Sequence, residues 1–85
     1  MKTISNSDEM IQWASRAKRG ERAVYYNGML IADRERHFQR GGFADTMPES
    51  MKAARSAWRA YMDGLVYLVQ KKNGPMDYDY IAVKS

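Results

Sequence analysis

The clearest alternation of hydrophobic and polar positions lies in the last third of the chain. From Met51 to Leu65, large apolar residues recur at helical spacing and share one arc of about 100° around the helix axis. We predict a helix over 47–63, ended by Gly64. The residues predicted to form its buried arc are Met51, Ala54, Trp58, Tyr61, Met62 and Leu65.

A terminal β-hairpin is predicted directly after this helix. Val66–Lys72 and Tyr78–Val83 are rich in β-branched and aromatic residues, which favour strands. Between them, Asn73-Gly74-Pro75 is typical of a tight turn.

The N-terminal segment predicts a helix over 7–19. Asn6 can cap it, and Glu9, three residues later, can reach back to the start of the helix. Gly20 can take the left-handed conformation that stops a helix. The residues that share its apolar face are Met10, Trp13, Ala14 and Ala17.

The middle of the chain allows two interpretations. A short strand is predicted over 22–26, and Asn27-Gly28 follows it. Asn-Gly between two apolar runs is a strong hairpin signal, which would pair 23–26 with 29–32. However, 29–39 contains mostly strong helix formers, so we favour a helix there, with Asn27-Gly28 as a strand-to-helix turn.

A linker is predicted over 40–47. Gly41-Gly42 is expected to stop the preceding helix, and Phe43 is expected to anchor the linker. Thr46 and Glu49 have the spacing of a capping box, with Pro48 in the first turn of the next helix.

The predicted order is helix, strand, helix, helix, strand, strand. This is the order of a winged helix, so we predict an α+β fold with one small winged-helix-like domain over 1–85 and the terminal hairpin as its wing. Trp13 and Trp58 are expected to share one core.

Composition limits the function classes. The chain has 85 residues, which is enough for one domain with a thin core. It has no cysteine, no apolar run of membrane-spanning length and no secretion signal, so we expect a protein of the cytoplasm without a membrane partner. Fourteen Lys and Arg against ten Asp and Glu give a net charge of +4, which mildly favours polyanionic partners.

The residues quoted above also carry a family resemblance. The first part of the pattern is Trp13, Gly20, Tyr25, Gly28, Leu30, Ala32 and Asp33-Arg34. The second part is 57–61 (Ala-Trp-Arg-Ala-Tyr), Gly64, Val66, 68–70 (Leu-Val-Gln), Gly74-Pro75, Tyr78 and 80–82 (Tyr-Ile-Ala). Together they resemble small, uncharacterised proteins of bacteriophages and prophages. The resemblance implies a binding role in a bacterial host cell, and it implies no catalytic residue.

A basic surface on the third predicted helix is the first candidate site. Lys52, Arg55, Ser56 and Arg59 are three and four residues apart, so they lie on one side of that helix. In a winged helix this side can enter the major groove of double-stranded DNA. The other interpretation is a solvated face in which Arg59 pairs with Asp63.

The predicted wing is a second candidate DNA contact. Lys71 and Lys72 end its first strand, where they can grip the DNA backbone. Asp77 and Asp79 on the opposite strand weaken that interpretation, because they can pair with the two lysines.

A mixed-charge run is the alternative site. Asp33, Arg34, Glu35 and Arg36 form either an exposed helix with local ion pairs or a protein interface. Six tyrosines also suit an interface, although most are predicted to be structural. We predict no enzyme, cofactor or metal site, because His37 is the single histidine and no phosphate-binding or dinucleotide motif is present.

Two functions follow from the sequence. The first is a small DNA-binding protein of phage or prophage, either a regulator or a recombination accessory factor. The second is a phage factor that binds a host protein and inhibits or redirects it. A homodimer is a further expectation, because a DNA-binding protein of this size often needs two copies to recognise a specific sequence.

Overall fold

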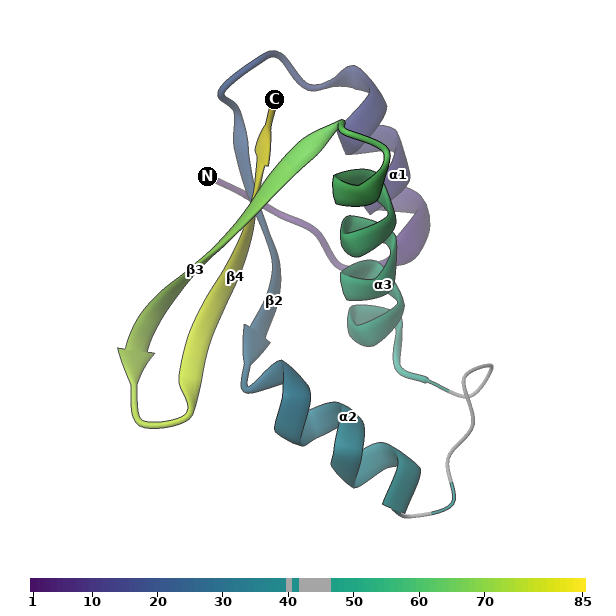
Figure 1. Cartoon of the computed structure of the whole chain (residues 1–85), viewed down its shortest axis with the longest axis vertical. Helices are drawn as coiled ribbons and strands as arrows, with labels where there is room; N and C mark the ends of the chain where they lie inside the picture. The colour runs from purple at the N-terminus through teal and green to yellow at the C-terminus, as the bar shows by residue number, and fades with distance from the viewer. Residues whose placement is uncertain (40, 42–46) are drawn as a thin grey trace.

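The computed structural model describes residues 1–39, 41 and 47–85, which form a small α+β domain. In chain order the elements of these residues are β1 (Lys2–Thr3), α1 (Ser7–Arg16), β2 (Arg22–Gly28), α2 (Leu30–Gln39), α3 (Glu49–Met62), β3 (Val66–Gly74) and β4 (Asp77–Lys84). Figure 1 shows α1 and α3 close together beside the sheet, whereas α2 extends from the far end of β2.

The strands of the described residues form one mixed sheet in the order β1-β2-β4-β3. β1 runs parallel to β2, and the other neighbours are antiparallel. The terminal hairpin is confirmed, but its strands extend further than predicted, to Gly74 and from Asp77, so the turn consists of Pro75 and Met76. The prediction missed β1, because two residues are too short to show a strand pattern.

The cap of α1 is confirmed. The Glu9 backbone N–H donates to Asn6 Oδ1 at 2.8 Å, and Glu9 itself accepts from the Ser5 backbone N–H at 2.7 Å. The helix ends at Arg16, three residues earlier than predicted. Ala17 closes it with extended backbone and an N–H bonded to the Trp13 carbonyl, so Gly20 lies beyond the helix, although its φ of +89° is left-handed.

The helix predicted in the middle of the chain is also confirmed, as α2, and the hairpin alternative is wrong. Asn27 and Gly28 continue the pairing of β2 with β4, opposite Asp79 and Tyr78. They therefore belong to β2, which extends to Gly28 and not to 26 as predicted, so the predicted strand-to-helix turn at Asn27-Gly28 is also wrong. Gly28 then ends the strand with a φ of +129°, a backbone conformation that residues other than glycine rarely adopt.

The core is centred between α1, α3 and the sheet. Met10 and Val66 are its largest fully buried side chains, and Trp13 is buried as predicted, with 7% of its surface exposed. Trp58 is 58% exposed, so the prediction that it shares this core is wrong.

The reason lies in the packing of α3. Its inward face consists of one large side chain, Met51, and four small ones, Ala53, Ala54, Ala57 and Ala60. Alanines at 53, 57 and 60 recur at helical spacing, and α3 packs both on α1 and on the sheet strands β2 and β3. The predicted arc was right for Met51 and Ala54, but Trp58, Tyr61, Met62 and Leu65 are exposed.

The winged-helix arrangement is not confirmed. α2 has no fully buried residue and packs mainly on β2, so α1 and α3 supply most of the helical core.

α3 begins at Glu49 after Pro48, without a side-chain cap from Pro48. The predicted roles of Gly42, Phe43 and Thr46 fall on residues outside the described part of the chain.

Candidate functional site

The surface of α3 that points away from α1 carries an aromatic face, which we define as Trp58, Tyr61 and Met62. These side chains are 58%, 42% and 65% exposed. The rings of Trp58 and Tyr61 contact each other, with centroids 5.3 Å apart. Because alanines take most of the inward positions in the second half of α3, the large apolar residues Trp58, Tyr61 and Met62 are left on the surface.

A cavity of about 470 Å³ adjoins this face. We call it the α2–α3 groove, because α2 and α3 form its walls and two sheet residues, Tyr25 and Leu68, contribute to its lining. Its remaining lining residues are Leu30 and Arg34 from α2, and Met51, Ala54, Arg55 and Trp58 from α3. The lining is therefore mostly apolar, with two guanidinium groups.

Tyrosines at the end of the sheet fix α2 beside the groove. The Leu30 backbone N–H donates to Tyr80 Oη at 3.1 Å, and Tyr26 Oη donates to Asp33 Oδ2 at 2.7 Å. The Tyr80 ring also lies 6.3 Å from that of Tyr25 and 5.9 Å from that of Tyr26. The wall formed by α2 is therefore held by polar contacts as well as by packing.

The same environment raises the pKa of two tyrosines, Tyr25 and Tyr26. Burial, with a smaller contribution from Tyr80, raises the pKa of Tyr25 to about 12. Burial first, and then the hydrogen bond to Asp33 and the charge of that carboxylate, raises the pKa of Tyr26 further. Both phenols are therefore protonated at neutral pH. Tyr26 donates the hydrogen bond to Asp33, and the buried Tyr25 ring packs near that of Tyr80.

The four residues of the predicted DNA site lie on one side of α3, as predicted, but their side chains have different surroundings. Lys52 Nζ lies 3.4 Å from Glu49 Oε1, and Arg59 Nε lies 3.8 Å from Asp63 Oδ2. The Ser56 hydroxyl is hydrogen-bonded to that of Ser7 on α1, so it takes part in helix packing. Arg55 lines the α2–α3 groove.

The lysines of the predicted wing lie elsewhere. Lys71 and Lys72 are exposed near the tip of the β3–β4 hairpin, which Figure 1 shows away from α3. They are neighbours in a strand, so their side chains point to opposite faces of the sheet. The structure therefore does not bring them together with the basic residues of α3.

The predicted ion pairs across the hairpin are wrong for the described residues. Lys71 stands opposite Asp79 in the register, yet the carboxylates of Asp77 and Asp79 accept hydrogen bonds from Asn27 Nδ2, at 3.1 and 2.8 Å. The side chain of Asn27 thus joins β2 to β4.

The mixed-charge run proves to have divided roles. Asp33 pairs with Arg36 at 3.3 Å, which confirms local pairing within the helix, and it also accepts from Tyr26. Glu35 is exposed, and Arg34 lines the α2–α3 groove. Within the run, Arg34 is thus the residue that joins the surface around Trp58.

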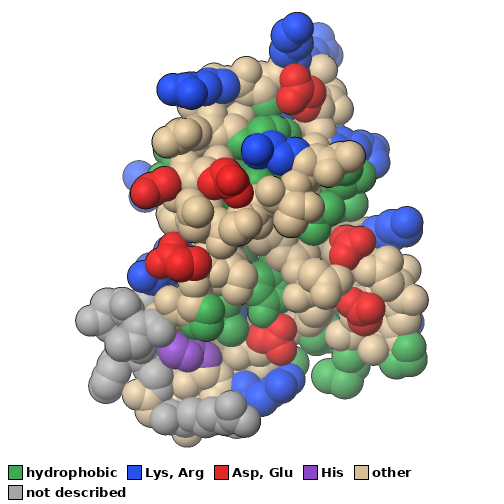
Figure 2. Space-filling model, turned by 180° about the vertical axis from the view of Figure 1, so that it is seen from behind, with side chains coloured by type: hydrophobic (Ala, Val, Ile, Leu, Met, Phe, Trp, Pro, Cys, Tyr) green, Lys and Arg blue, Asp and Glu red, His purple; other side chains and the backbone are tan. Residues whose placement is uncertain are grey.

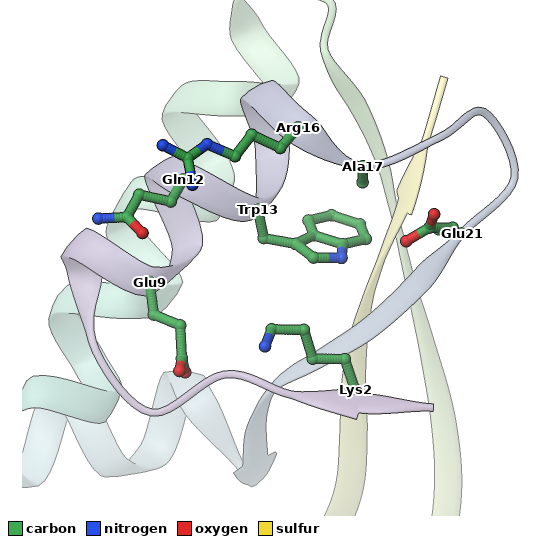
Figure 3. A pocket seen from close by; sticks show the side chains of 7 residues that line it. All are labelled: Lys2, Glu9, Gln12, Trp13, Arg16, Ala17 and Glu21. Carbon is green, nitrogen blue, oxygen red and sulfur yellow. The ribbon is translucent and has the colours of Figure 1, made fainter.

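Another cavity, of about 360 Å³, lies beside α1. Figure 3 shows Trp13 projecting from α1 toward the space between Lys2 and Glu21, with Arg16 farther along the helix. Glu21 accepts a bond from the Lys18 backbone N–H, just as Glu9 accepts from Ser5. Glu9 thus stabilises the start of α1, and Glu21 stabilises the loop between α1 and β2.

Charge is scattered on the face that Figure 2 shows, where Lys and Arg atoms alternate with Asp and Glu atoms. Among residues 1–39, 41 and 47–85, no group of three or more His, Asp or Glu side chains is placed to hold a metal ion. In the same residues, no helix has the length and apolar character needed to cross a membrane.

Comparisons of the chain with family models, curated proteins and solved structures gave no significant match. The resemblance to phage and prophage proteins therefore stays a prediction.

Sequence reasoning missed the α2–α3 groove and the aromatic face. It placed Trp58 in the core, so neither its exposure nor its proximity to Arg34 and Arg55 was expected. A signal was present in Ala53, Ala57 and Ala60, which lie at i, i+4 and i+7 and define a stripe suited to close helix packing. Tyr25 and Leu68, in contrast, reach the groove through the sheet register, which local patterns do not specify.

Proposed function

We propose that this protein binds a partner protein through the aromatic face of α3 and the α2–α3 groove. The observation that carries the proposal is Trp58, which is 58% exposed, contacts Tyr61 and shares the groove with Arg55. Tryptophan, tyrosine and arginine are the residues most enriched among those that dominate binding energy at protein interfaces. Exposed together on one helix, they favour a protein partner.

The resemblance predicted from the sequence gives this proposal its biological setting. A partner-binding factor of phage or prophage would act in the cytoplasm of a bacterial host, on a host protein. A second copy of the chain is the other protein partner expected from the sequence. Binding would proceed without catalysis or a cofactor.

DNA binding is the second candidate function. The net charge of +4 and the exposed Arg55, Lys71 and Lys72 favour it. Its weakness is that Lys52 and Arg59 have acidic neighbours that reduce the local positive potential. Exposed pairs of this kind contribute only about 0–1 kcal/mol each, so DNA phosphates can compete with them.

Site-specific photocrosslinking tests the protein-binding proposal. A benzophenone amino acid replaces Tyr61 in one variant and Met76, exposed at the hairpin tip, in a control variant. In bacterial lysate we expect a discrete protein adduct from position 61 that excess unlabelled wild-type protein removes, and none from position 76. Equal adduct patterns from both positions would reject the proposal.

A titration with random duplex DNA separates the two functions. If DNA is the partner, binding at low salt should weaken steeply as salt rises, and each lost phosphate contact should flatten the salt slope by about one unit. The triple substitution of Lys52, Arg55 and Arg59 by alanine would then weaken binding. If the wild-type protein binds DNA in a salt-sensitive way and the triple variant does not, DNA binding becomes the better supported function.

A further inference from the structure

The two arginines of the α2–α3 groove are distinguished by their ionic environment. Arg36, Lys52 and Arg59 on the same two helices each have a carboxylate within 4 Å. Among the described residues, no ion pair is found for Arg34 or Arg55. The carboxylate of Asp33 already accepts hydrogen bonds from Tyr26 and Arg36, and that of Glu49 accepts one from Lys52. The groove thus presents two guanidinium groups that have no carboxylate partner of their own within the described part of the chain.

The rest of the lining is apolar or aromatic. Leu30, Met51, Ala54 and Leu68 offer no side-chain hydrogen bonds, and Trp58 and Tyr25 supply rings. A volume of about 470 Å³ lies within the usual range for sites that enclose a small ligand or a few side chains. Such a lining fits an aliphatic or aromatic side chain.

Charge complementarity indicates which groups should lie beside that apolar side chain in the ligand. Arginine binds carboxylates with two parallel hydrogen bonds, and a guanidinium beside apolar surface is less hydrated than an ammonium group. Arg34 comes from α2 and Arg55 from α3, so acidic groups on either side of an inserted apolar side chain would meet both.

We propose that the α2–α3 groove binds a segment of the partner protein in which acidic residues flank a phenylalanine or a large aliphatic residue. This inference rests on the proposed function and names the chemistry of the partner. A single-stranded nucleic acid would also meet arginine and tryptophan. However, its base edges would find few hydrogen-bonding groups among the leucines, methionine and alanine of the lining.

Defined peptides test the inference on the full chain. The probe is acetyl-Asp-Phe-Glu-Leu-amide, and its matched control is acetyl-Asn-Phe-Gln-Leu-amide, which keeps the apolar side chains without the charges. Two-dimensional ¹H–¹⁵N NMR should show the probe shifting the indole N–H of Trp58 and the groove backbone, while the buried Trp13 indole stays unchanged. The neutral peptide should bind at least about tenfold more weakly, equivalent to about 1.4 kcal/mol.

Substitutions localise the effect. The double variant Arg34→Gln, Arg55→Gln should bind the acidic peptide about tenfold or more weakly than the wild-type protein does. Arg59→Gln is the matched control, because Arg59 lies one turn along α3, has a side chain that is 83% exposed and does not line the groove. All three arginines are exposed, so the NMR spectrum of each variant should retain the dispersion of a folded chain.

Three outcomes would overturn the inference: equal binding of the acidic and neutral peptides, an equal effect of Arg59→Gln, or tighter binding of oligothymidine in the same groove. The crosslink from position 61 keeps this test separate from the proposed function. If that crosslink persists at full yield in the Arg34→Gln, Arg55→Gln variant, partner binding stands and the acidic specificity of the groove is rejected. If no position-specific crosslink forms, the proposed function itself fails.

Discussion

The hydroxyl of Tyr26 donates a 2.7 Å hydrogen bond to the carboxylate of Asp33, which joins the end of β2 to the first turn of α2. Gly28 lies directly beside this bond. A Cβ at position 28 would be 3.0 Å from Asp33 Oδ2, so a glycine permits the close approach of strand and helix. Because α2 has no fully buried residue, this bond is one of the few contacts that hold it to the sheet.

Removal of that hydroxyl should loosen α2. We expect Tyr26→Phe to lower the free energy of unfolding by about 1.5–3 kcal/mol, the usual range for a hydrogen bond to a charged group. Urea denaturation measures this loss, and amide hydrogen exchange should show faster opening in α2 than in α1. Tyr67→Phe is the control, because Tyr67 is 62% exposed, and it should change stability by less than about 0.5 kcal/mol.

Local signals in the sequence predicted the elements well. Asn6 and Glu9 act within one turn of helix, so their spacing alone indicates the start of α1. Helix formers over 29–39 likewise favoured α2 over a hairpin. The terminal hairpin follows from its own alternation and turn residues, without reference to the rest of the chain.

Tertiary packing was the part that local patterns could not predict. Ala57 and Trp58 lie about 100° apart around the helix axis, and hydrophobicity alone favours the arc that contains the larger side chain as the buried one. The burial of Ala57 instead reflects the packing of α3 on α1 and on the sheet. The face that α3 buries thus depends on its neighbour, and so does the composition of the α2–α3 groove.

The two tryptophans should respond differently to substitution. Trp13→Ala empties a buried site and should cost about 3–5 kcal/mol, which can unfold a domain of this size. Trp58→Ala removes an exposed ring and should cost less than about 1 kcal/mol. Thermal denaturation compares the two variants. Acrylamide should quench the fluorescence of Trp58 and spare that of Trp13, and a Trp58→Ala variant as unstable as Trp13→Ala would contradict the exposed position.

The alanine face of α3 gives a third expectation. Ala57 has 0% of its surface exposed, so a larger side chain there must push the helix away from its neighbours. We expect Ala57→Leu to destabilise the protein by about 1–3 kcal/mol through overpacking. Arg59→Leu introduces the same side chain at a site whose side chain is 83% exposed and should change stability by less than about 1 kcal/mol. Equal midpoints in urea for the two variants would show that Ala57 does not lie in a tight interface.

The stability of the protein should fall at alkaline pH because of Tyr25. Its pKa is raised to about 12 in the folded state, mainly by burial, whereas an unfolded tyrosine has a pKa near 10. The unfolded chain therefore loses this proton first, so the contribution is fully present below pH 10 and is lost as pH rises from about 10 to 12.

By pH 11 the loss attributable to Tyr25 should reach about 1.4 kcal/mol. Urea denaturation at pH 8 to 11 measures it against Tyr25→Phe, which lacks the titrating group and should lose correspondingly less stability. Tyr26 remains in both proteins, and because its pKa is also raised, its own alkaline loss should persist in the variant. The other titratable side chains are the same in both proteins, so the difference between their curves reports on Tyr25. Parallel curves would show that the hydroxyl of Tyr25 titrates as in the unfolded chain.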